Sequence, residues 1–240
     1  MNTAPRHHNN DHTISVLTGA DSAHSRTLAA PKAARWLALG ALVGPILFTA
    51  AWAVLGFLSP GYSAWGTWIG PYSPIHQGIS GLGLGVTAPY MNTAFVVGGF
   101  IVMVGAIGIF QSIREIGGVA RWSCTVLLAL SGLGMALDGI FTLESFLPHM
   151  AGFLLAAGSP VLSFVVIGLW LRRVPSFRRF GNWLLLGSPL TLVLLVLYFM
   201  TFSPTVAGTQ TGVAGLTERI LVVEVFAWVV ALGWLAFRRS

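Results

Sequence analysis

The 240-residue sequence is poor in charged residues and in cysteine, and each shortage excludes a class of protein. Charged side chains make up 8% of the residues, about a third of the ~25% that is usual in soluble domains. Apolar side chains make up 55%, which is more than a water-soluble particle of this size can bury. A soluble enzyme is therefore excluded. The single cysteine, Cys124, also excludes an internal disulfide framework and a multi-cysteine zinc module.

The charge that is present is mostly basic, with 13 Lys and Arg against 7 Asp and Glu. A basic excess is common in nucleic-acid-binding proteins, but the cytoplasmic loops of membrane proteins carry the same excess. Because the chain is so apolar, we predict the lipid bilayer as its partner and expect no nucleic acid.

The chain divides into a polar tail and a long apolar region. Residues 1–35 show no apolar periodicity, which predicts a disordered cytoplasmic tail. Residues 36–238 contain six runs that are each long enough to cross the ~30 Å hydrocarbon core as a helix. These runs are Trp36–Leu58, Thr93–Phe110, Trp122–Phe141, Met150–Leu171, Asn182–Phe202 and Arg219–Phe237. The pattern predicts an all-α integral membrane protein, a bundle of six transmembrane helices.

The basic residues predict how this bundle is oriented. The tail, the second-to-third connection, the fourth-to-fifth connection and the C-terminus contain every Lys and Arg except Arg219. These segments share one side of a six-span topology, and basic loops face the cytoplasm. Both termini are therefore expected to be cytoplasmic.

The remaining titratable residues gather on the opposite, outer side. Outside the tail, every histidine and every acid except Glu115 belongs to this half: His76, Asp138, Glu144, His149, Glu218 and Glu224. Arg219 is the cation near them. Any functional site is therefore expected to open outward.

Glu224 lies about two helical turns inside the sixth span. An ionised side chain at the centre of a membrane helix costs at least ~2.5 kcal/mol. The carboxyl group therefore requires an interhelical partner, and Asp138 or His149 is expected to supply it. Asp138 is expected to meet either Glu224 or His149.

The first outer loop, Ser59–Asn92, is 34 residues long and carries no formal charge. Its Leu, Ile, Val and Trp content predicts that it packs across the outer mouth of the bundle. Long loops of this kind often have a functional role. We expect residues Ile75–Gly85 to contact at least two spans and to bring His76 or Ser80 over the bundle interior.

Three kinds of chemistry remain open for the outer residues. A serine hydrolase requires Ser80, one histidine and Asp138, although Gly-Ile-Ser-Gly is not a G-x-S-x-G elbow. A zinc hydrolase requires three ligands from His76, His149, Asp138, Glu144 and Glu224, but the two histidines among them are not in H-x-x-x-H spacing. A proton-coupled carrier can use Glu224 and Asp138. We expect no metal or cofactor. The polar-pocket candidates are His76, Ser80, Asp138, His149, Glu218, Arg219 and Glu224.

Several polar motifs resemble those of one bacterial membrane family. The motifs are Tyr72-Ser73-Pro74 with Ile79-Ser80 and Asn92, then Asp138-Gly139-Ile140-Phe141 with His149, and finally Gly215-Leu216-Thr217-Glu218-Arg219. The chain is similar over about residues 36–238 to the family catalogued as domain of unknown function 998, in its actinobacterial form. Many relatives have proline where this chain has Thr142.

This resemblance implies a six-helix protein of the bacterial plasma membrane without an assigned activity. It also suggests a distant similarity to eukaryotic membrane proteins of the Frag/DRAM type. We therefore expect a multi-pass protein with an outward polar pocket that binds or moves a small or lipidic molecule. The alternative is a membrane-embedded hydrolase acting on a lipid or lipid-linked substrate at the outer leaflet. The sequence does not decide between an enzyme and a binding protein.

Overall fold

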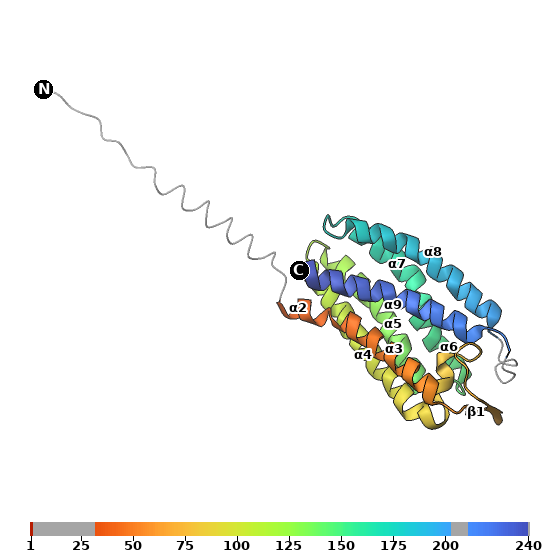
Figure 1. Ribbon diagram of the computed structural model, residues 1–240. Coiled ribbons are helices and arrows are strands. Elements are labelled where there is room, and N and C mark those ends of the chain that lie inside the picture. The colour runs from red at the N-terminus through yellow and green to blue at the C-terminus, as the bar shows by residue number, and fades with distance from the viewer. Residues whose placement is uncertain (2–31, 203–210, 240) are drawn as a thin grey trace.

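The computed structural model describes Met1, residues 32–202 and residues 211–239. Within these residues, six helical segments are long and apolar enough to cross a membrane. They span Lys32–Leu58, Gly85–Ser112, Gly118–Ile140, Phe146–Leu171, Arg178–Thr201 and Ala214–Arg239. The structure confirms the predicted all-α fold with six membrane-spanning helices, which lie side by side in one bundle (Figure 1). Most of the predicted tail falls outside the described residues.

The helices are α2 (Lys32–Leu37), α3 (Gly40–Leu58), α4 (Ala88–Ser112), α5 (Gly118–Ile140), α6 (Phe146–Phe153), α7 (Ser159–Leu171), α8 (Arg178–Thr201) and α9 (Ala214–Arg239). Most of them begin several residues before the apolar runs predicted. In α4 these extra residues include Pro89 in the first turn, where proline is tolerated because its missing N–H has no helical partner. The apolar runs thus located the helices but underestimated their length.

Small residues hold the helix backbones close together. A Cβ atom added to Gly40 would lie 2.6 Å from the Ile101 carbonyl oxygen, and one on Gly132 would lie 2.4 Å from the Gly99 carbonyl oxygen. Gly134 of α5 meets the Gly152 carbonyl oxygen at 2.4 Å by the same measure. Helices approach this closely in membranes where small residues face each other. The contacts place α4 between α3 and α5, with α6 on the other side of α5.

The fourth membrane-spanning segment is interrupted near its middle. A short π-helical turn, η3 (Leu154–Gly158), separates α6 from α7, and Pro160 follows it at the start of α7. Proline has no N–H to donate to the preceding turn, and its ring crowds the carbonyl group four residues earlier. The wider π turn accommodates both effects. As a result, α6 forms a separate short segment at the end of the bundle that contains His149.

The first outer loop folds into short elements at that same end. Strands β1 (Tyr62–Ala64) and β2 (Thr67–Ile69) pair antiparallel, and the 3-10 helices η1 (Ile79–Gly83) and η2 (Gly85–Thr87) follow. Trp65 and Gly66 form the hairpin turn with φ values of 49° and 77°. Positive φ at both central residues is the conformation that a two-residue type I′ turn requires.

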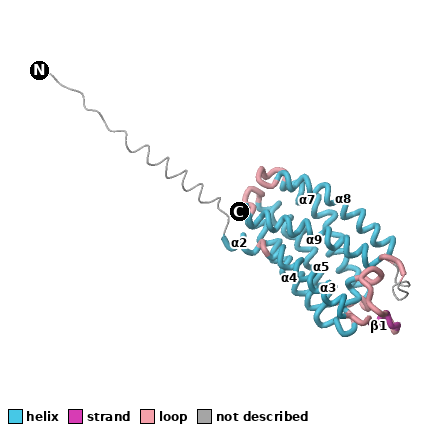
Figure 2. Tube along the Cα trace, viewed as in Figure 1, coloured by secondary structure: helices cyan, strands magenta, loops and turns pink. Residues whose placement is uncertain are grey.

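The two ends of the helical region lie at the opposite end of the bundle from the hairpin (Figure 2). The Arg35 Nε–H donates a 2.5 Å hydrogen bond to the Phe237 carbonyl oxygen. The Arg35 guanidinium group also lies 4.9 Å from the centre of the Phe237 ring. The first and last spans therefore begin and end on the same side.

Candidate functional site

The segment between Tyr72 and Gly83 lies against the bundle. The Leu216 amide of α9 donates to the Ile75 carbonyl oxygen at 3.1 Å, and η1 contacts α3, α4 and α9. The prediction that this loop packs across at least two spans is confirmed. Its backbone polar groups are satisfied by a helix, as a buried loop requires.

Arg219 of α9 fastens this loop from within the membrane-spanning helix. Its Nη1 atom donates to the carbonyl oxygens of Pro74 at 2.8 Å and Gln77 at 2.9 Å. Its Nη2 atom donates to the Tyr72 hydroxyl group. The guanidinium group also lies 5.2 Å from the centre of the Trp52 ring. These contacts satisfy both terminal nitrogens of the buried guanidinium group, so Arg219 has a structural role in holding the loop.

The tyrosines of the loop remain protonated near neutral pH. Burial raises the pKa of Tyr72 to about 12, although the neighbouring Arg219 acts in the opposite direction. Burial, reinforced by Tyr72 and Glu218, also raises the pKa of Tyr62. Both phenol groups are therefore hydrogen-bond donors on this face of the loop.

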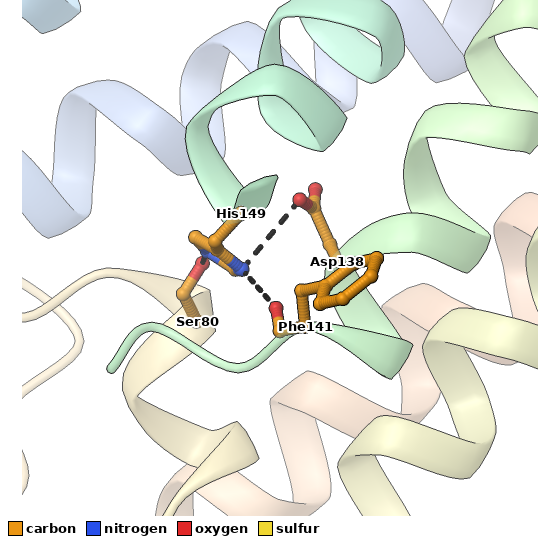
Figure 3. Close-up of polar contacts among 4 residues, drawn as sticks. All are labelled: Ser80, Asp138, Phe141 and His149. Carbon is orange, nitrogen blue, oxygen red and sulfur yellow. Dashed lines mark hydrogen bonds and ion pairs between the residues drawn. The ribbon is translucent and has the colours of Figure 1, made fainter. Parts of the chain in front are cut away.

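Ser80, His149 and Asp138 come together beneath the loop (Figure 3). The Ser80 Oγ atom lies 2.8 Å from the His149 Nε2 atom. The His149 Nδ1 atom lies 2.8 Å from the Phe141 carbonyl oxygen and 3.6 Å from the Asp138 Oδ1 atom. Asp138 and His149 are each only 4% exposed. The expectations that Ser80 lies over the bundle interior and that Asp138 meets His149 are confirmed.

The partners of the ring fix the tautomer of His149. A carbonyl oxygen only accepts, so Nδ1 carries the proton and donates it to Phe141. Nε2 then has a free lone pair, which accepts the Ser80 hydroxyl proton. A hydroxyl group bonded to a basic nitrogen, with the other nitrogen oriented by a backbone carbonyl and close to a carboxyl group, resembles the arrangement that activates a serine nucleophile.

Glycines make room for the side chains of Asp138, Glu218 and Tyr62 around this site. A Cβ atom on Gly152 would lie 2.3 Å from Asp138 Oδ1, and one on Gly78 would lie 2.3 Å from Glu218 Oε2. A Cβ atom on Gly81 would lie 2.6 Å from the Tyr62 ring. Side chains at positions 78 and 81 would therefore displace the groups on either side of Ser80, which explains the sequence Gly-Ile-Ser-Gly in packing terms.

A cavity of about 50 Å³ opens beside Ser80 and His149. Its lining includes His76 and Gln77 from the loop, Glu218 from α9 and the exposed Thr211. This volume holds a few water-sized groups. A reacting ester carbonyl therefore fits in the cavity while the rest of a larger molecule stays outside.

A second cavity of about 30 Å³ lies on the inner side of Ser80 and is also lined by Asp138 and Glu218. The Asp138 Oδ1 atom is buried and accepts no hydrogen bond from the described residues. Its surroundings otherwise are largely apolar, including Phe95 and Met135. Apolar side chains therefore surround the Asp138 carboxyl group on this side of the site.

Glu218 lies between the two cavities and contributes to the lining of both. It is 3% exposed, and its Oε2 atom accepts a 3.1 Å hydrogen bond from the Ile79 amide. No described cation forms an ion pair with it, because the neighbouring Arg219 points its guanidinium group toward the loop carbonyls. Depth along the helix predicted Glu224 as the central acid, whereas the structure places Glu218 there.

The expectation that Glu224 pairs with Asp138 or His149 is wrong. Its Oε2 atom accepts from the Thr191 hydroxyl group of α8 at 2.9 Å, and its Oε1 atom accepts from Trp228 Nε1 at 2.5 Å. Glu224 lines neither of the two cavities. The requirement for an interhelical partner was correct, but a threonine on the adjacent helix satisfies it. The sequence did not identify Thr191 because hydroxyl groups are common in such spans.

The other candidates have simpler surroundings. His76 lines the outer cavity, and its Nδ1 atom lies 2.7 Å from the Gly212 carbonyl oxygen. Glu144 is set apart from the site, where it accepts a 3.3 Å hydrogen bond from the Trp65 amide. Among the described residues, no group of three or more His, Cys, Asp or Glu side chains is arranged to hold a metal ion.

These features define a multi-pass helical membrane protein with a polar cluster at one end of the bundle. The family model described as protein of unknown function (DUF998) matches residues 42–235. Since the match covers most of the chain, the protein belongs to this family. No curated protein and no solved structure matches the chain.

Proposed function

We propose that the protein is a membrane-embedded serine hydrolase that cleaves an ester of a lipid or lipid-linked molecule at the outer leaflet. One observation carries the proposal: the Ser80 hydroxyl group donates to His149 Nε2 at 2.8 Å beside a cavity that both residues line. A nucleophile within hydrogen-bond reach of an oriented base is the recognised signature of covalent catalysis.

The proposed reaction follows from the protonation states. Ser80 Oγ attacks the ester carbonyl carbon while His149 Nε2 takes the hydroxyl proton. The tetrahedral intermediate then expels the alcohol, which receives that proton from His149, and an acyl-serine remains. A water molecule, deprotonated by His149, releases the carboxylic acid and restores Ser80. The Phe141 carbonyl orients the ring and stabilises the protonated imidazole through the Nδ1 hydrogen bond, and the Asp138 carboxyl group lies 3.6 Å from Nδ1.

The site and the two ends of the helical region lie at opposite ends of the bundle (Figure 2). Because basic residues collect at the end where the first and last spans meet, we place both termini in the cytoplasm and the site at the outer surface of a bacterial plasma membrane. A site on the outer surface is not exposed to the cytoplasmic nucleotide pool, but it has direct access to lipid headgroups. This location supports a lipidic ester as the substrate.

Labelling with an alkyl fluorophosphonate tests the proposal in the purified full-length protein, since this probe modifies serines that a neighbouring base activates. We expect one adduct, at Ser80, that disappears in Ser80→Ala and falls strongly in His149→Gln. Ser63→Ala is the matched control, because Ser63 lies in the same loop within the exposed hairpin. An unlabelled protein that still binds a ligand in the cavity would instead favour a non-enzymatic binding protein or carrier.

A further inference from the structure

Four aromatic side chains contribute to the lining of the outer cavity. Tyr62, Phe153, Tyr198 and Phe202 all line it. The Phe153 and Tyr198 rings have centroids 4.8 Å apart, and those of Tyr198 and Phe202 are 5.5 Å apart. Aromatic faces carry partial negative charge and attract cations. The rings come from the loop, α6 and the end of α8, so the fold assembles this wall from three separate segments.

The acid in this cavity forms no ion pair in the described part of the chain, although the charge of the adjacent Arg219 acts on it. Glu218 accepts one recorded hydrogen bond, from the Ile79 amide, and forms no ion pair with any described residue. The other titratable side chains lining the cavity are Tyr62 and Tyr198, whose phenol groups stay neutral, and His76 and His149. The Nδ1 atoms of the two histidines face the carbonyl oxygens of Gly212 and Phe141. A buried carboxylate is stable when a cation compensates its charge, and aromatic walls favour the same kind of occupant.

We infer that the cavity binds an ammonium group of the substrate, placing it against Glu218 and the aromatic wall beside Ser80. This inference rests on the proposed hydrolase function and specifies its substrate class as esters that carry a primary ammonium group near the carbonyl. The ammonium group must lie close to the ester carbonyl, because Glu218 accepts a hydrogen bond from the amide of Ile79, the residue that directly precedes Ser80. The cavity of about 50 Å³ accommodates a primary ammonium group, whose N–H groups can donate to the Glu218 carboxyl group, whereas a trimethylammonium group has no N–H to donate.

The first experiment compares two esters that differ only in this ammonium. The p-nitrophenyl esters of alanine and of propionic acid share a carbon skeleton, and the rate with Ser80→Ala is subtracted to remove spontaneous hydrolysis. Because the α-ammonium group itself activates the carbonyl, the rates with each ester are compared after division by the rate constant for hydroxide hydrolysis of the same ester. We expect this normalised kcat/KM to be about tenfold higher or more for the alanine ester, as one charge-assisted contact provides. In Glu218→Gln, which can still accept the Ile79 amide proton, the two esters should react at similar normalised rates.

Glu144→Gln is the matched control, because Glu144 is an outer carboxylate that lines neither cavity. It should leave the preference for the alanine ester unchanged. Equal normalised Ser80-dependent rates for both esters in the unmodified protein would overturn the ammonium site and leave the hydrolase standing. No Ser80-dependent hydrolysis of either ester would overturn the hydrolase.

If neither ester is hydrolysed, a binding measurement still tests the ammonium site. Ethylammonium chloride should raise the thermal unfolding temperature of the Ser80→Ala protein more than sodium chloride at equal ionic strength. Tetramethylammonium chloride should not, and the additional Glu218→Gln substitution should abolish the ethylammonium effect. A stability that depends only on ionic strength would overturn the ammonium site independently of any hydrolysis.

Discussion

The Ser80 hydroxyl oxygen and the His149 Nε2 atom lie 2.8 Å apart, although 69 positions separate the two residues in the sequence. Ser80 belongs to a 3-10 turn of the outer loop, and His149 belongs to the short helix before the π turn. Both elements are short and lie at the same end of the bundle, and this brings their side chains into contact. The contact depends on the loop being held down by Glu218 and Arg219.

Kinetic non-additivity should show that Ser80 and His149 act together. We expect Ser80→Ala and His149→Gln each to reduce the rate of ester hydrolysis by at least about 10³-fold, and the double variant to lose little more, because neither group works without the other. Steady-state kinetics of the three variants measure this. Losses that multiply in the double variant would show that the two residues act separately.

Asp138 should contribute less than the acid of a serine-protease triad. There the carboxylate alone fixes the tautomer, and its replacement by Asn costs ~10⁴-fold in kcat. Here the Phe141 carbonyl oxygen already accepts the Nδ1 proton. We therefore expect Asp138→Asn to lower kcat by roughly tenfold to a hundredfold while leaving KM nearly unchanged. A loss as large as that of His149→Gln would show that the carbonyl does not orient the ring.

Glu224 should matter for stability and not for the site. Thr191→Val removes a donor from its carboxyl group and should lower the free energy of unfolding by about 1 kcal/mol. Glu224→Leu leaves the Trp228 Nε1–H without its acceptor, so it should lower the free energy of unfolding by about 1–3 kcal/mol. Thermal unfolding in detergent measures both changes. Fluorophosphonate labelling of Ser80 should be unchanged in each variant, and a loss of labelling would place Glu224 in the catalytic cluster.

Alkaline pH should weaken the attachment of the loop. The pKa of Tyr72 is raised from 10.0 to about 12 in the folded protein, mainly by burial. Since the folded state holds this proton more tightly, its contribution to stability is complete below pH 10 and is lost as the pH rises to about 12. The unfolding temperature should therefore fall across this range. The fall should be shallower in Tyr72→Phe, and an identical slope would remove Tyr72 from the cause.

The sequence was informative where a single segment determined the outcome. Apolar runs located the six helices, and the uncharged composition of Ser59–Asn92 predicted its packing on the bundle. It was less informative where an outcome depended on which faces of two helices meet. Glu218 and Glu224 are both acids near the start of α9, and only the packing of the loop and α8 separates their roles. Short elements such as the hairpin were also missed because they lack apolar periodicity.

The orientation of the bundle is open to direct measurement with cysteines. The native Cys124 is buried, so its background reactivity should be low. Ser63 lies in the exposed hairpin and Ser176 in the exposed connection between α7 and α8, at opposite ends of the bundle. Because the basic residues collect at the Ser176 end, the positive-inside rule places that end in the cytoplasm. In intact cells, an impermeant maleimide should label Ser63→Cys but not Ser176→Cys, and permeabilisation should make both react. Labelling of Ser176→Cys alone in intact cells would invert the topology and turn the Ser80 cavity toward the cytoplasm, which would exclude an outer-leaflet substrate.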